Sequence, residues 1–270
     1  SDRDGNELDR VKVPVLAADS AYTLDLSGNK WRVMSATPAR ENIILKNSEI
    51  IISGDIEKPF FSVEPGFYDE AFYLEIDSSE GTEVYYTLDG TEPDLDSLLY
   101  NGPIYIEDVS YKENVYAAID NISTRDDAYI PEHLIDKANV IRAIAVDNEK
   151  REKSSETIGS YFVGYSEKYG YNNLYTLSIV MDPEDLYDYE KGIYVTGKVC
   201  DDNWDEEAAG NSSSYKKTAL ANYKKEGKGW RRNANLEVYG KDRQLAYKQL
   251  IEFGIHGGWS VAHNQKSFNL

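Results

Sequence analysis

Short segments in which apolar and polar residues alternate constrain this chain more than any other feature. Residues 72–76 and 84–88 alternate in this way, and the turn signal Asp89-Gly90 follows the second segment. Residues 140–146 form a more continuous apolar segment that Arg142 interrupts. Period-two alternation is typical of a half-buried strand, and short strands separated by turn signals favour a β-sandwich. We therefore predict a mainly β protein.

The amino-acid composition limits which classes of molecule this chain is expected to bind. The length of 270 residues indicates two or three domains. The chain has 48 acidic and 29 basic residues and a net charge of −19, so we expect no nucleic-acid partner, which would need clustered basic side chains. No apolar run reaches the length of a bilayer crossing, and no membrane span is expected. Cys200, the only cysteine, is interpreted as a small buried apolar residue.

The segment 251–270 carries the main candidate for chemistry. Apolar and polar residues alternate over 251–255, and Gly257-Gly258 then permits a turn with unusual backbone angles. Lys266 begins the next expected strand and shares its face with apolar side chains. Burying a lysine is costly unless an anion accompanies it, and a nucleotide phosphate would be such an anion. The other interpretation is an edge-strand lysine that points into water.

Three motifs in this part of the chain carry a family resemblance. "GIYVTG" at 192–197, "WRRNANLEVY" at 230–239 and "GIHGGWS…QKSFNL" at 254–270 resemble the N-terminal part of the CotH kinase family. The resemblance implies an atypical kinase that transfers phosphate from ATP, with Mg²⁺, to a surface or coat protein. In this sequence Val261 stands where the family commonly has arginine.

The resemblance also implies a nucleotide-binding set, namely Lys266, Glu237 and Ser260. Glu237, on an expected neighbouring strand, or Glu252 would orient the lysine. The catalytic and metal-binding acids of the family lie beyond position 270, so we expect neither catalytic residues nor metal ligands in this chain alone. We interpret the chain as a fragment of a longer protein.

Two further resemblances concern the earlier parts of the chain. "VYYTLDGTEPD" at 84–94, "YNGPIYI" at 100–106 and "VIRAIAV" at 140–146 are similar to the C-terminal β-sandwich domain of chitobiase and β-hexosaminidase. Asp4-Gly5, Ser20, Tyr22, Trp31 and Thr37-Pro38 resemble the end of a lamin-tail domain.

The expected domains are therefore 1–55, 56–166 and 167–270. Their expected fold is a series of immunoglobulin-like β-sandwich modules followed by an incomplete α+β kinase-like region. The resemblances imply an exported protein, extracellular or at the cell surface.

Several local structures are predicted from turn and cap signals. Asp182-Pro183 is typical of a helix start, and Ser212–214 favours a helix over 215–225. Residues 192–197 are expected to be a strand between glycines. The segment 111–139 is longer than a sandwich loop needs, and we expect a short helix near 131–138 without assigning the segment a task.

Two other functions are alternatives to a kinase. Residues 258–262 approach the G-x-S-x-G nucleophile elbow, but Ala262 replaces the last glycine and no acid follows, so a hydrolase is not favoured. The remaining alternative is a non-catalytic surface scaffold or adhesion protein. Its tyrosines would stack on a polysaccharide, although tyrosine is also a common strand residue. The tyrosines considered are Tyr68, Tyr73, Tyr85 and Tyr105.

Overall fold

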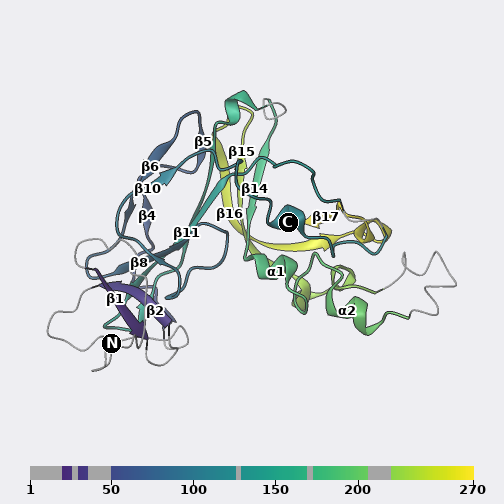
Figure 1. The fold of residues 1–270 in the computed structure, drawn as a ribbon, viewed down its shortest axis with the longest axis horizontal. Coiled ribbons are helices and arrows are strands. Elements are labelled where there is room, and N and C mark those ends of the chain that lie inside the picture. The colour runs from purple at the N-terminus through teal and green to yellow at the C-terminus, as the bar shows by residue number, and fades with distance from the viewer. Residues whose placement is uncertain (1–19, 26–29, 36–49, 126–128, 169–172, 206–219) are drawn as a thin grey trace, which may run out of the picture.

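The computed structural model describes residues 20–25, 30–35, 50–125, 129–168, 173–205 and 220–270 (Figure 1). Within this part the protein is mainly β, with a few short helices, which confirms the predicted class. In the expected first domain, strands β1 and β2 pair as an antiparallel hairpin, and β3 pairs with β12 of the next expected domain. Most of the lamin-tail signature lies outside the described residues. No helix in the described part of the chain combines the length and apolarity needed to cross a bilayer.

The early strands are β1 (Ser20–Asp25), β2 (Lys30–Ser35), β3 (Ile51–Ile52), β4 (Phe60–Phe61), β5 (Gly66–Tyr68), β6 (Phe72–Leu74), β7 (Ile76–Asp77), β8 (Glu83–Thr87), β9 (Leu98–Leu99), β10 (Ile104–Ile106), β11 (Asn139–Asp147), β12 (Glu152–Lys153) and β13 (Thr157–Val163). The later strands are β14 (Thr176–Val180), β15 (Arg232–Tyr239), β16 (Leu245–His256) and β17 (Ser267–Asn269). The helices are α1 (Pro183–Tyr187), α2 (Gly197–Asp202) and the 3₁₀ turns η2 (Tyr116–Ala118), η3 (Tyr165–Glu167), η4 (Asn222–Lys224), η5 (Lys228–Trp230) and η6 (Trp259–Ala262).

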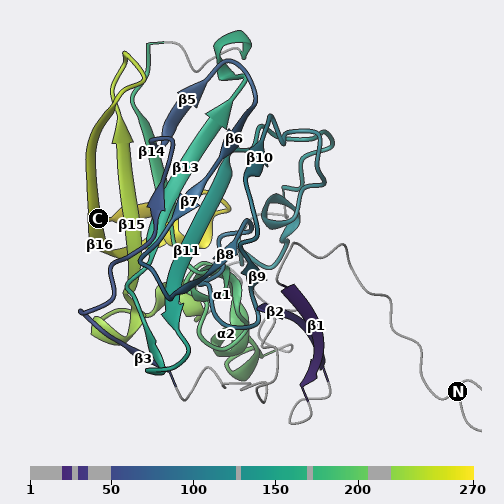
Figure 2. The same cartoon turned by 90° about the vertical axis from the view of Figure 1, so that its left-hand side faces the viewer.

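A large curled sheet forms the centre of the first half of the protein, by which we mean residues 50–168. The second half is residues 173–270. Its strand order is β3-β12-β11-β13-β5, and β8 pairs with both β11 and β9. The pairs β12–β3 and β13–β5 are parallel, and the other pairs of this sheet are antiparallel. Two small sheets, β4–β7 and β6–β10, lie over one face of it (Figure 2).

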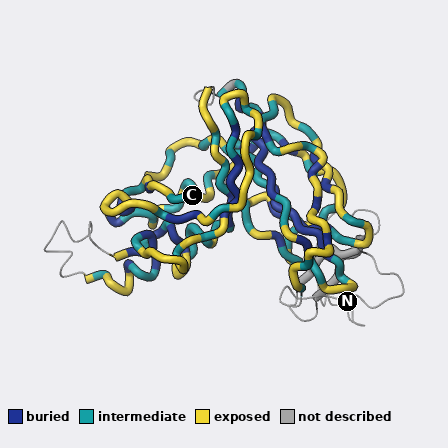
Figure 3. Tube along the Cα trace, turned by 180° about the vertical axis from the view of Figure 1, so that it is seen from behind, coloured by how far each residue is buried: buried dark blue, intermediate teal, exposed yellow. Residues whose placement is uncertain are grey.

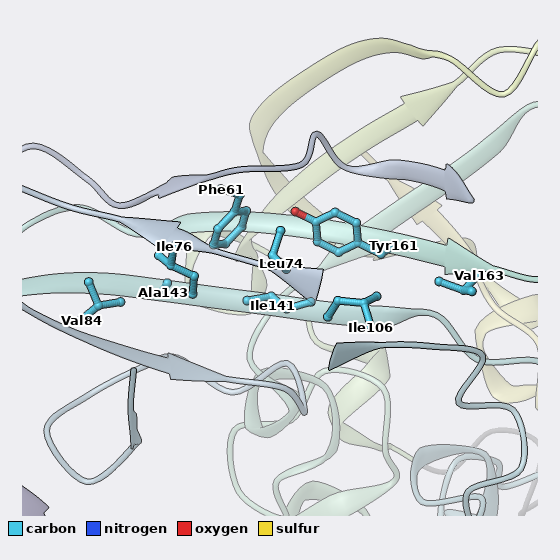
Figure 4. Packing of buried hydrophobic residues seen from close by; sticks show 9 residues of the cluster. All are labelled: Phe61, Leu74, Ile76, Val84, Ile106, Ile141, Ala143, Tyr161 and Val163. Carbon is cyan, nitrogen blue, oxygen red and sulfur yellow. The ribbon is translucent and has the colours of Figure 1, made fainter. Parts of the chain in front are cut away.

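The hydrophobic core of this half lies between the large sheet and the two small sheets (Figure 4). The alternation predicted at 72–76 places Leu74 and Ile76 in this core and leaves Tyr73 and Glu75 exposed. Residues 84–88 are less regular, because Tyr85 joins a second cluster on the other face and Leu88 is exposed. The core side chains are Phe61, Leu74, Ile76, Val84, Ile106, Ile141, Ala143, Tyr161 and Val163.

The turn after β8 has the structural role that its sequence predicts. Asp89 Oδ1 accepts hydrogen bonds from the backbone N–H and the hydroxyl of Thr91, at 3.1 and 2.6 Å. Arg142, on β11, donates to the carbonyl oxygen of Gly90 at 2.7 Å and forms an ion pair with Glu156. The arginine that interrupts the apolar segment therefore fastens this turn to the sheet.

Strand β13 is buried on both faces because a second sheet packs against it. Figure 3 shows buried, dark blue segments where the two halves of the molecule meet. Tyr161 and Val163 point into the core just described, whereas Phe162 packs against Tyr239 of β15 at 5.4 Å between ring centroids. The second sheet has the order β14-β15-β16-β17 and is antiparallel throughout. The two sheets therefore share a packed interface, visible as neighbouring layers in Figure 2.

Strand β16 begins at Leu245 and extends over 12 residues, well before the alternation recognised at 251–255. Residues 235–239 therefore lie opposite 250–245. Helix α1 begins as predicted, since the Asp182 side chain accepts a hydrogen bond from the N–H of Glu184 and Pro183 opens the helix.

Three local predictions need correction or fall outside the structure. Residues 192–197 contain no strand, and residues 131–138 contain no helix. Of the helix expected over 215–225, positions 215–219 lie outside the described residues, and the short 3₁₀ turn η4 covers 222–224.

Candidate functional site

Lys266 lies immediately before β17 and is turned into the protein, with 5% of its surface exposed. Its Nζ donates hydrogen bonds to the carbonyl oxygens of Ile122 and His263, both at 2.6 Å. The ammonium also lies over the rings of Tyr223 and Tyr194, at 4.2 and 4.9 Å from their centroids. Carbonyl oxygens and ring faces both attract a cation, so they offset part of the cost of burying this charge. The interpretation of Lys266 as a solvent-facing edge residue is therefore wrong.

The turn that leads to Lys266 depends on glycine. Strand β16 ends at His256, and Gly257 has φ 128°, a conformation that residues with a side chain rarely adopt. A Cβ atom at Gly257 would lie 2.4 Å from the Ser260 Oγ. Ser260 itself is exposed in η6. The glycine signal in the sequence therefore predicted the turn correctly, and Ser260 lies against it.

Glu237 is fully buried but belongs to a different place in the fold. Its Oε1 lies 2.9 Å from Lys248 Nζ, and its Oε2 accepts a hydrogen bond of 2.9 Å from the Tyr239 hydroxyl. Lys248 also donates to the carbonyl oxygen of Ile158 on β13. The carboxylate is thus committed to the interface between the two sheets.

The structure does not bring Glu237 and Lys266 together. Glu237 lies opposite Lys248, whereas His256 lies opposite Ser267, the residue after Lys266. Eight residues of β16 separate these two registers, which at about 3.4 Å per residue is roughly 27 Å. The expectation that Glu237 orients Lys266 is therefore wrong. Glu252, the other residue considered, is exposed and lies opposite Asn233. A nucleotide-binding role for Lys266, Glu237 and Ser260 stays a prediction.

Sequence reasoning missed the segment that contacts Lys266. Residues 121–124 come from the 111–139 segment of the first half, and each makes a hydrogen bond to the second half. The carbonyl oxygen of Ile122 binds the ammonium, and the Ser123 hydroxyl donates to the carbonyl oxygen of Ala262 at 2.6 Å. No sequence signal marks these partners, because two of the contacts use main-chain carbonyls that every residue has.

The residues of the "GIYVTG" motif, 192–197, form an irregular segment beside Lys266. Gly197 has φ 57°, and a Cβ atom there would lie 2.2 Å from the Nδ2 of Asn222. Asn222 is fully buried, and its Nδ2 donates to the carbonyl oxygens of Tyr189 and Gly192 at 3.0 and 3.1 Å. The two glycines of the motif are thus explained by close approach to other chain segments, which also places Tyr194 beside Lys266.

Other titratable groups near this region have structural partners. The Asp202 carboxylate accepts from Lys198 at 2.8 Å, and Asp201 accepts from the Tyr189 hydroxyl at 2.8 Å. Among the described residues no group of histidine, cysteine and acidic side chains could hold a metal ion. Cys200 is buried, and burial raises the pKa of its thiol, as expected for a packed apolar residue.

Comparison with known families identifies one domain. Residues 74–158 match the family described as "Fn3 associated", so this part of the chain is an Fn3-associated domain. The match runs from β6 into β13 and includes the 111–139 segment. No curated protein and no solved structure matches the chain. The comparisons give no support to the CotH, chitobiase and lamin-tail resemblances, which stay predictions.

Proposed function

We propose that this chain is part of an exported, multi-module atypical kinase of the CotH type. In this proposal the β14–β17 sheet opens the kinase domain, and Lys266 contacts the phosphates of ATP. The observation that carries it is the inward position of Lys266, which follows a glycine turn between two antiparallel strands and is 5% exposed. Phosphoryl transfer depends on a fixed cation at the phosphates, and a buried lysine on a sheet is one way to provide it.

The remaining parts of the activity are proposals about the longer protein. The magnesium ligands and the catalytic acids would lie outside this chain, and the acceptor would be a surface or coat protein. The earlier modules, including an immunoglobulin-like sandwich over 56–166, would hold the kinase region away from its attachment point.

Magnesium-dependent ATP binding tests this proposal directly. In the full protein that contains this chain, Lys266→Met should lower ATP affinity at least tenfold, because a charge-assisted bond to phosphate is lost. Lys198→Met, which removes an exposed lysine paired with Asp202, should leave the affinity unchanged. Lys266→Arg keeps the charge and shows whether a loss in Lys266→Met comes from misfolding. Absence of ATP binding by the wild-type protein would overturn the proposal.

A non-catalytic surface scaffold is the second candidate function. It is favoured by two lysine bonds that join the two halves. Lys266 donates to the carbonyl oxygen of Ile122, and Lys248, the partner of Glu237, donates to that of Ile158. For a scaffold, Lys266→Met should lower the thermal midpoint of unfolding, and no form should bind ATP.

A polysaccharide is the partner that this scaffold would hold. Tyr73 and Tyr105 lie opposite each other on β6 and β10, are 65% and 52% exposed, and have ring centroids 5.1 Å apart. Paired exposed rings can stack on the apolar faces of sugars. Tyr73→Ala should abolish retention by a polysaccharide in affinity electrophoresis, and the exposed β16 variant Tyr247→Ala should not.

A further inference from the structure

Residues 121–124, which we call the strap, lie across the site around Lys266. Asn121 accepts from the N–H of Thr196 at 2.8 Å, and Ile122 accepts from Lys266 at 2.6 Å. The Ser123 hydroxyl donates to Ala262, and the N–H of Thr124 donates to the Tyr223 hydroxyl at 3.1 Å. Four successive residues therefore bind four separate points around one buried ammonium.

The chain on both sides of the strap is anchored, by contacts within the first half and by one contact to α1. Upstream of it, the Tyr116 hydroxyl donates to the carbonyl oxygen of Asp89 at 2.9 Å, and the Tyr116 ring stacks on Tyr187 of α1. Further along, Lys137 donates to Asn114 Oδ1 at 3.0 Å, which ties the two ends of the segment together. The strap is thus a fixed extension of the Fn3-associated domain that reaches over the neighbouring sheet.

Every residue of the strap makes a hydrogen bond to the second half. Two of its hydrogen bonds go to main-chain atoms, of Thr196 and Ala262, and one goes to the Lys266 ammonium. Thr124 adds two contacts to the Tyr223 hydroxyl, one from its N–H and one from its own hydroxyl. Each such bond contributes about 1 kcal/mol to stability, so a competing charged ligand can replace them. A phosphate oxygen is a stronger acceptor for an ammonium than a carbonyl oxygen is.

We infer that the strap is an intramolecular cover of Lys266, which an incoming phosphate must displace. This inference rests on the proposed function and adds its regulation: the Ile122 carbonyl occupies a donor that the nucleotide phosphate would take. The apparent affinity for nucleotide is then the intrinsic affinity multiplied by the fraction of molecules in which the strap is open. A partner that moves the Fn3-associated segment would switch the site on.

The first test measures how well the strap protects Lys266. The double variant Ser123→Ala/Thr124→Val keeps the main chain. It removes the Ser123 hydroxyl bond to Ala262 and the contact of 2.7 Å between the Thr124 and Tyr223 hydroxyls. Its Lys266 amine should be acetylated by a small amine-reactive ester about tenfold faster than in the wild type, as read from the modified peptide. The control is Ser78→Ala/Thr82→Val, a serine–threonine pair on the same domain whose hydroxyls contact each other at 3.1 Å. It should leave the rate unchanged. An unchanged rate in the strap variant would overturn the cover.

The second test separates the cover from the proposed function. Magnesium ATP should bind the strap variant about tenfold more tightly than the wild type. On adding it to the wild type, the amide hydrogens of Thr196 and Thr124 should exchange faster, because their bonds across the strap are broken. Faster acetylation with no ATP binding in any form would retain the cover and defeat the proposed function. Tight ATP binding of equal affinity in both forms would do the reverse.

Discussion

Glu237 Oε1 lies 2.9 Å from Lys248 Nζ across the neighbouring strands β15 and β16, at the interface between the two sheets. The carboxylate is fully buried, whereas the lysine side chain is 35% exposed. A buried carboxylate that loses its partner keeps the full cost of desolvation. The pair therefore contributes to the stability of the second sheet where that sheet packs on the first.

Lys248→Met should lower the free energy of unfolding by about 3 kcal/mol, near the low end for a buried pair because the lysine is partly in water. Combining it with Glu237→Gln should restore part of the loss, giving a coupling energy above about 1 kcal/mol in urea unfolding. The exposed pair Lys191–Glu184 is the control, and Lys191→Met should cost less than about 1 kcal/mol. Equal losses from both lysine variants would contradict the buried role.

Local signals in the sequence predicted the structures that depend on neighbouring residues. The alternation at 72–76, the long strand over 140–146 and the Asp182 cap are all present. Each depends on side-chain period or on a bond within two or three residues. The glycine turn before Lys266 belongs to the same class, since a conformation with φ 128° needs glycine wherever it occurs.

The incorrect predictions have a different cause. Each concerned a structure that depends on distant parts of the chain. The motif at 192–197 is not a strand, and the carbonyl oxygen of its Gly192 is bound by the buried Asn222, 30 positions away. Glu237 does not meet Lys266 because the length of β16 sets the register, and that length was underestimated. One oxygen partner of Lys266 is the main-chain carbonyl of Ile122, 144 positions away, which has no signature in the sequence.

Arg142 offers a second test of the contacts that hold the first half together. Its guanidinium makes bonds of 2.8 and 3.0 Å to the two oxygens of Glu156 and one of 2.7 Å to Gly90. Arg142→Lys cannot reproduce this planar set and should cost about 2 kcal/mol, and Arg142→Met about 3–5 kcal/mol, in chemical unfolding. The exposed Lys150→Met, which breaks the pair with Asp147, should cost under about 1 kcal/mol. A small loss in Arg142→Met would mean that the turn at Asp89-Gly90 is held by other contacts.

Gly197 tests the explanation given for the "GIYVTG" motif. Gly197→Ala introduces a Cβ atom 2.2 Å from Asn222 Nδ2, and the backbone there has φ 57°. We expect a loss of about 3 kcal/mol, from backbone strain together with displacement of the buried amide. Gly81→Ala also has positive φ, 83°, but its Cβ would meet no atom within 4 Å. Gly81→Ala should lower the free energy of unfolding by only about 1 kcal/mol. Thermal unfolding of both variants measures the two losses. Equal costs would assign the whole effect to backbone strain.

The buried tyrosines make the fold sensitive to alkali. Burial, with a smaller contribution from the nearby Tyr194 and Tyr116, raises the pKa of Tyr187 from 10.0 to about 12. Burial also raises the pKa values of Tyr161 and Tyr239. The folded protein thus holds these phenol protons more tightly than the unfolded chain does. The resulting stabilisation is fully present below about pH 10 and is lost as the pH rises through the folded pKa.

Tyr187→Phe removes one of these groups, so the variant should lose less stability than the wild type between about pH 10 and pH 12. A shift of two pKa units corresponds to roughly 2–3 kcal/mol at the alkaline end. The difference in unfolding free energy between the two proteins should be constant from about pH 6 to pH 9, which provides the internal control. Urea unfolding at successive pH values measures it. The wild-type curve should still fall steeply, because Tyr161 and Tyr239 remain. A difference that stays constant up to pH 12 would show that the Tyr187 hydroxyl titrates alike in the folded and unfolded chains.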